Sequence, residues 1–156
     1  MGGATLNALM LGALALLLVS AGLQDARTRE IANWKNAGIA MLAPLWWWSN
    51  GFLLWPDLAI HLGIAAGVFA LFLVPFYFGW MGGGDVKMIG ALALWFPLQG
   101  LLWMLIIMSL LGGALTLLIV IDRAVRRKSE IEVPYGVAIA IAALISLPEP
   151  FLNHFL

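Results

Sequence analysis

Long apolar segments separated by short polar ones make up almost the whole chain. Four of the six segments have the length of about 20 residues that a membrane-spanning helix needs, and the fourth and sixth are shorter. Pro44 is expected to kink the second segment or to mark a short re-entry, and Asn50-Gly51 is a turn signal near its end. The pattern predicts an all-α membrane protein, a bundle of six transmembrane helices. Their expected positions are residues 4–23, 34–55, 58–78, 86–96 (extending from Asp85), 101–121 and 134–147.

The basic residues indicate how these segments are oriented. All eight fall in the first, third and fifth connections, and none lies in the second or fourth connection or near either terminus. Because Lys and Arg accumulate on the cytoplasmic side, we expect the odd connections to be cytoplasmic and both termini extracytoplasmic. The basic residues are Arg27, Arg29, Lys35, Lys87, Arg123, Arg126, Arg127 and Lys128.

Aromatic and small residues add two expectations. Trp and Tyr favour membrane interfaces, so Trp55 is expected at the outer interface and Trp80, with residues 76–78, at the inner one. Gly63 with Gly67, and the Gly112-Gly113 pair, are expected to let helices pack closely.

Composition excludes several classes of protein. The chain is 63% hydrophobic and 10% charged, with a mean hydropathy of +1.01, whereas soluble domains carry roughly 25% charged residues. Six spans use most of the 156 residues, so residues 1–156 are expected to form one membrane-embedded domain. The net charge of zero argues against a nucleic-acid partner. Cysteine is absent and His61 and His154 are isolated, so no metal site is expected.

Two acidic residues stand out because the predicted topology puts them at one membrane depth. Asp25 ends the first span and Asp85 begins the fourth, both on the cytoplasmic side. Charged groups in a membrane are costly and therefore suggest function. Two neighbouring carboxyls share a proton, so one can activate water while the other protonates the carbonyl or the leaving amine. That is the arrangement of aspartic proteases.

Three glycines, Gly82, Gly83 and Gly84, precede Asp85. Glycine permits unusual backbone conformations and close approach of a substrate, so the run is consistent with a substrate-facing notch. A flexible turn followed by an Asp helix cap explains the same residues. From the residues alone, both interpretations remain open.

Three segments resemble type IV prepilin peptidases. Gly82-Gly83-Gly84-Asp85-Val86-Lys87 resembles their Gly-x-Gly-Asp motif, and Asp25 to Asn33 resembles their other aspartate segment, with Ala32 where proline is usual. Residues 133–140 resemble the signature of their last span. The order of the segments and the size of the chain resemble the short branch that serves Flp (Tad) pili. Longer relatives carry a cytoplasmic segment with paired cysteines, linked to N-methylation of the product; this chain has neither, so methyl transfer is not expected.

The resemblance implies an aspartic endopeptidase that cleaves the leader from prepilins or pseudopilins at the cytoplasmic face of the bacterial inner membrane. Asp25 and Asp85 would be the catalytic pair, and Gly82, Gly83, Gly84 and Lys87 would contact the substrate. Neither metal nor organic cofactor is implied. The partners expected are the prepilin and the lipid bilayer.

Two other functions are alternatives. A small proton-coupled transporter would use the acids as relay groups, and predicts carboxylates near the middle of the bilayer. A non-catalytic pilus assembly factor would not need the acids at all. Neither alternative explains the common depth of the two acids together with the glycine run.

Overall fold

The described part of the chain folds into helices, with no β-strand in it. The computed structural model describes residues 2–126 and 133–147. Six α-helices follow one another in the predicted order, with a short irregular helical turn, η1, before the third. The predicted all-α class is therefore confirmed. The elements are α1 (Gly2–Thr28), α2 (Asn33–Ser49), η1 (Leu54–Leu58), α3 (Ala59–Tyr77), α4 (Gly83–Ala93), α5 (Leu98–Arg126) and α6 (Tyr135–Ser146).

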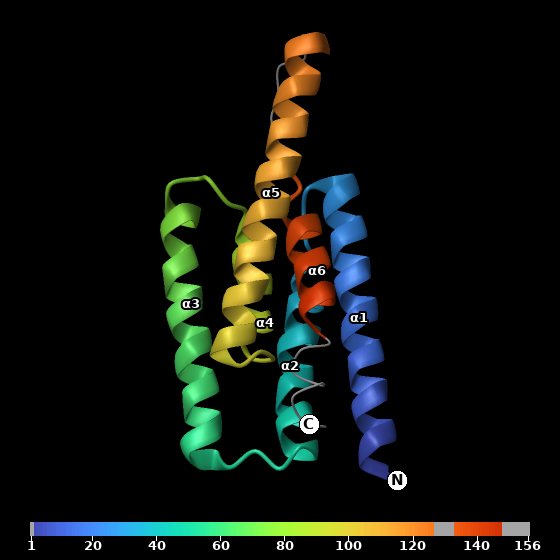
Figure 1. Cartoon of the computed structure of the whole chain (residues 1–156), viewed down its shortest axis with the longest axis vertical. Helices are drawn as coiled ribbons and strands as arrows, with labels where there is room; N and C mark the ends of the chain where they lie inside the picture. The colour runs from blue at the N-terminus through green and yellow to red at the C-terminus, as the bar shows by residue number, and fades with distance from the viewer. Residues whose placement is uncertain (1, 127–132, 148–156) are drawn as a thin grey trace.

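The α-helices lie side by side with their axes close to one direction (Figure 1). The α1–α2 and α3–α4 connections lie at one end, and the α2–α3 and α4–α5 connections lie toward the other. We call the first of these the basic end, because Arg27, Arg29 and Lys87 lie at it or in the turns that lead to it. The connections at this end are the first and the third along the chain. Asp25 lies near the end of α1 and Asp85 at the start of α4, so both lie at the basic end.

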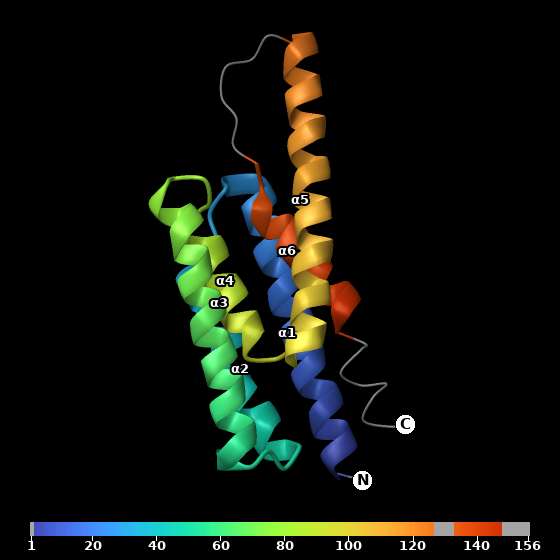
Figure 2. The same cartoon turned by 60° about the vertical axis from the view of Figure 1, so that its left-hand side comes forward.

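Three helical stretches are long and apolar enough to cross a membrane: Thr5–Thr28, Leu54–Tyr77 and Leu98–Asp122. The helices α4 and α6 have 11 and 12 residues, fewer than the about 20 that a single crossing needs. Helix α5, with 29 residues, extends past the other helices at the basic end (Figures 1 and 2). Six complete crossings and the orientation of the termini stay predictions.

The helix bounds differ from the apolar segments where polar residues continue a helix or a turn signal ends one. Helix α1 runs on to Thr28, five residues past the predicted end of the first span, because backbone hydrogen bonding does not require apolar side chains. Helix α2 ends at Ser49, and the predicted turn follows, with Gly51 at φ +69°. Helix α2 continues through Pro44 as one helix. Helix α3 agrees with the prediction to within one residue at each end.

Helix α4 lies at the centre of the core. Most of its residues are buried, including Asp85, and it packs against α2, α3 and α6. Its first turn is therefore held by neighbours on several sides. The largest fully buried side chains come mainly from α1, α4, the residues that follow α4, and α5; they are Leu14, Leu18, Ile39, Val86, Met88, Ile89, Leu92, Phe96, Leu101, Met104 and Ile139.

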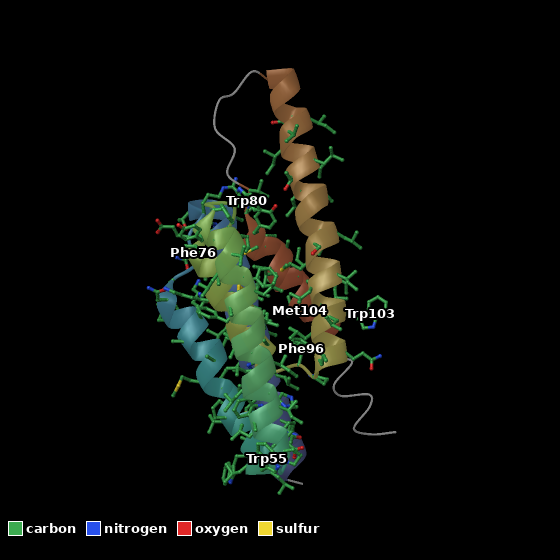
Figure 3. The ribbon with its side chains drawn as sticks, turned by 90° about the vertical axis from the view of Figure 1, so that its left-hand side faces the viewer. Trp55, Phe76, Trp80, Phe96, Trp103 and Met104 are labelled. Atoms are coloured by element: carbon green, nitrogen blue, oxygen red, sulfur yellow. The ribbon has the colours of Figure 1, made fainter. Side chains whose placement is uncertain are left out.

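Helix α3, by contrast, lies at the periphery. Ala65 is its one buried residue, and large apolar side chains such as Leu71 are exposed along it. Trp55 lies at one end of this helix and Phe76 and Trp80 lie at the other (Figure 3). Exposed apolar side chains flanked by aromatic ones suit the interior and the two interfaces of a bilayer.

The glycines at close contacts between helices differ in part from those expected from the sequence. A Cβ at Gly63 or Gly67 would meet nothing within 4 Å, so no described helix packs closely there. A Cβ at Gly90 would lie 2.8 Å from Cδ2 of Phe69, where α4 meets α3. Gly112 is tightly packed as expected, since a Cβ there would lie 2.8 Å from Cε1 of Tyr135, whereas its neighbour Gly113 is open. Spacing along one helix does not reveal which face has a neighbour.

Gly90→Leu should destabilise the fold by forcing α3 away from α4. Overpacking typically costs ~1–3 kcal/mol, and for a chain of this size each kcal/mol lowers Tm by roughly 2–4 °C. Gly67→Leu is the matched control, because it makes the same change on an open helix face. The measurement is thermal unfolding of both variants in detergent micelles, and equal Tm values would contradict the packing described.

Candidate active site

Asp25 is buried in the last two turns of α1 and faces the start of α6. Its side chain is 4% exposed. The backbone N–H of Val137 donates to Asp25 Oδ2 at 3.3 Å, and the backbone of Gly136 also hydrogen-bonds to this carboxyl. Arg29, in the turn after α1, contributes a nearby positive charge.

This contact completes the start of α6. The first N–H groups of any helix lack partners within the helix and form its positive end. Pro134, the residue before α6, makes no side-chain cap. The N–H of Val137 also donates to the carbonyl of Pro134 at 3.2 Å, and the carboxyl of Asp25 adds a second acceptor from α1. Helix α6 in return fixes the orientation of the carboxyl.

Gly136 makes the approach of Asp25 to α6 possible. A Cβ at this position would lie 2.8 Å from Asp25 Cγ and 2.7 Å from Cδ1 of Ile31. Either contact is too short for a real side chain. Gly136 was not among the site residues expected from the sequence, although it falls in the segment that resembles the last-span signature.

Asp85 is the third residue of α4 and is also buried, at 7% exposed. Its carboxyl hydrogen-bonds to the backbone of Gly82, the residue that precedes the helix. An acidic side chain that reaches back from the third helical position is one half of a capping box. The expected Asp cap at this turn is thus real, but it works from inside the helix rather than from the residue before it.

The structure brings the two carboxyls together at the basic end. Asp25 lies close enough to Asp85 for its charge to act on that carboxyl. Ile31, in the α1–α2 connection, packs beside both: it contacts the positions of Gly136, next to Asp25, and of Gly84, next to Asp85. Ile31 was also missed from the sequence. Its signal was a single large apolar residue in a short connection that also carries Arg29 and Glu30.

The three glycines before Asp85 provide space rather than unusual conformation. Within the described residues the glycines with positive φ are Gly51 and Gly79, so the strained turn lies ahead of the run. A Cβ at Gly83 would be 3.2 Å from the Phe76 ring, and one at Gly84 would be 3.2 Å from Cβ of Ile31. The glycines let α4 begin closely packed against the end of α3, where Phe76 lies (Figure 3), and against the α1–α2 connection.

Lys87 is exposed. Its Nζ donates to Asn33 Oδ1 at 2.8 Å and so joins the starts of α4 and α2. Ala32, where the resemblance has proline, adopts φ −61°, which is the value that proline would impose. The turn into α2 thus keeps the same backbone without proline.

The polar groups available for chemistry at this end are chiefly the two carboxyls. In residues 2–126 and 133–147 no three His, Cys, Asp or Glu side chains come together as metal ligands would. Two buried carboxyls close enough for the charge of one to act on the other can move protons to and from a bound water or carbonyl.

Comparison with protein families agrees with this geometry. The model of the type IV leader peptidase family matches residues 12–117. The chain belongs to the type IV leader peptidase family. Searches of curated proteins and of solved structures gave no match. Family membership indicates a protease, and the resemblance deduced from the sequence is thereby confirmed.

In this leader peptidase the family match covers both aspartates and the glycine run, but it ends before α6. The contact of Gly136 and Val137 with Asp25 is therefore a contribution of the tertiary structure to the site. It gives a structural reason for a glycine at position 136.

Gly136→Ala should displace the Asp25 carboxyl from the start of α6. Because small misplacements of reacting groups lower rates steeply, we expect the rate of leader-peptide cleavage to fall at least about tenfold. The measurement is the initial rate of cleavage of a prepilin by purified protein in detergent.

Gly113→Ala is the control for that experiment, since a Cβ at Gly113 meets nothing within 4 Å. It should keep the rate of the unsubstituted enzyme. Full activity of Gly136→Ala would show that Asp25 does not need its present position.

Proposed function

We propose that this leader peptidase is a membrane aspartic endopeptidase that removes the leader from type IV prepilins of the Flp/Tad kind. Asp25 and Asp85 are its catalytic pair. The observation that carries the proposal is the pairing of two buried carboxyls, from helices far apart in the sequence, in a chain of the type IV leader peptidase family.

The reaction follows from one proton shared between the two carboxyls. The ionised carboxyl takes a proton from a water molecule, whose oxygen attacks the carbonyl carbon of the scissile peptide. The protonated carboxyl gives its proton to the carbonyl oxygen, and a tetrahedral intermediate forms. The carboxyl that took the proton from water then gives it to the amide nitrogen, while a hydroxyl of the intermediate returns a proton to the other carboxyl. The C–N bond breaks, a carboxylic acid and a free amine are left, and one proton is again shared by the pair.

The surroundings of the carboxyls support this chemistry. Burial strengthens the interaction of each carboxyl with its partners, and the N–H groups of α6 hold Asp25 in one orientation. Ile31 forms an apolar wall beside both. An aspartic pair needs fixed geometry and limited access of bulk water, and these residues supply both.

The site is proposed to face the cytoplasm, at the inner membrane of a bacterium. Arg27 and Arg29 follow Asp25 closely in the sequence, and Lys87 follows Asp85; basic connections are retained on the cytoplasmic side. The apolar segment of the prepilin would approach from the bilayer, with its basic leader in the cytoplasm.

Asp25→Asn and Asp85→Asn should each lower the cleavage rate at least about 10³-fold, because an amide can neither accept the proton of water nor donate one as an acid. The rate is followed by the mobility shift of a prepilin substrate.

Asp57→Asn is the matched control, since Asp57 accepts from the N–H of Leu53 in the turn before α3, at the opposite end. It should cleave normally. Retained processing by either of the first two variants would remove that residue from the mechanism, and a proton flux in proteoliposomes that depends on Asp85 would favour a transporter instead.

Cleavage should be insensitive to metal chelators, because two carboxyls supply all the acid–base groups that the reaction requires. The purified protein is incubated with a prepilin, with and without EDTA, and the N-terminus of the product is sequenced. A single new N-terminus directly after the leader is expected in both samples, and loss of cleavage with EDTA would count against an aspartic mechanism.

A further inference from the structure

Helices α2 and α4 run parallel and are hydrogen-bonded to each other near both ends. Asn36 Nδ2, in the first turn of α2, donates to the backbone carbonyl of Gly84 at 3.0 Å. Eleven residues later Trp47 Nε1 donates to the carbonyl of Leu94, also at 3.0 Å. Leu94 follows the last residue of α4 and lies ten residues after Gly84. Each of the two hydrogen bonds can therefore be removed by a substitution that leaves the other in place.

The bond from Asn36 acts on the peptide group that leads directly into Asp85. The carbonyl of Gly84 and the N–H of Asp85 belong to the same planar amide. Fixing that carbonyl therefore fixes the rotation of the backbone from which the Asp85 side chain projects.

The start of α4 needs such a support. Glycine has more backbone freedom to lose than any other residue, and Gly83 and Gly84 are the first two residues of the helix. Gly82, which precedes them, has no side chain to cap it. A first turn built this way frays readily unless a neighbouring element holds it.

The buried amide of Asn36 is energetically unfavourable in one respect. The residue is 5% exposed, and within the described residues its Oδ1 has no hydrogen-bond partner. A buried polar atom without a partner is unfavourable. An apolar residue of similar size would avoid that loss, so packing alone does not account for asparagine here.

We propose that Asn36 is a positioning residue that holds the first turn of α4, and with it the Asp85 carboxyl, in place for catalysis. The inference rests on the proposed function, since it assigns Asn36 a part in peptide cleavage. It acts through the Gly84 carbonyl and contacts no reacting atom.

The test compares three variants of the full-length protein in steady-state cleavage of a prepilin. Asn36→Leu removes the donor while keeping the branched shape and the number of side-chain heavy atoms, and should lower kcat about tenfold or more, with KM within about twofold. Asn36→Gln keeps an amide donor and should retain more of kcat than Asn36→Leu. Trp47→Phe removes the hydrogen bond to the Leu94 carbonyl, far from Asp85; it should lower Tm but leave kcat within about twofold.

An unchanged kcat in Asn36→Leu would overturn the inference and leave the proposed function intact. Equal losses of kcat in Asn36→Leu and Trp47→Phe would also overturn it, because they would indicate a general structural role.

A second measurement does not depend on cleavage. The chain has no cysteine, so Asp85→Cys introduces a single thiol at the site. Its alkylation by a small water-soluble reagent should become several-fold faster when Asn36→Leu is added, and should not change when Trp47→Phe is added. If Asp85→Cys is alkylated at the same rate with and without Asn36→Leu, Asn36 does not position residue 85 and the inference is overturned. The proposed function fails by a different result, namely that the unsubstituted protein cleaves no prepilin.

Discussion

The site depends on one contact: the backbone N–H groups of Gly136 and Val137, in the first turn of α6, donate to the buried carboxyl of Asp25. Each partner satisfies a need of the other, because Pro134 gives α6 no side-chain cap and a buried carboxyl requires donors. The contact joins α1 to α6, which are far apart in the sequence but packed together. It also explains why residue 136 is glycine, since a Cβ would occupy the place of the carboxyl.

The second carboxyl is held in a different way. Asp85 caps its own helix from within, by reaching back to the backbone of Gly82. Its helix, α4, is enclosed by α2, α3 and α6. The glycines that let α4 begin so close to Phe76 and Ile31 also weaken its first turn, and the hydrogen bond from Asn36 on α2 counters that weakness. Close packing and stability at this turn thus come from different residues.

The outer surface of the molecule suits a membrane, and its interior suits a polar reaction. Helix α3 exposes apolar side chains along its length, with Trp55 and Trp80 toward its two ends (Figure 3). The carboxyls lie inside, where they are removed from this apolar surface. The proposed reaction requires an apolar segment of the prepilin to enter from the bilayer and a peptide bond to be hydrolysed with water. Helices that present apolar side chains outward and enclose two acids at one end are compatible with both demands.

The sequence alone determined the helical class, the order of the helices, the turn at Asn50-Gly51 and the family. Apolar segments and turn residues are local signals, and the Asp25 and Gly82–Asp85 motifs are short and contiguous, so each can be seen without a fold. The common end of the two acids also followed, because the alternation of basic connections constrains topology. What only the tertiary structure decided was which residues meet. Gly63 and Gly67 have the spacing of a packing face but no neighbour, whereas Gly90 and Gly136 face another element at close range. The roles of Ile31, Asn36 and Gly136 likewise arise from contacts between separate helices and connections, and a linear pattern does not record which faces of those elements come together.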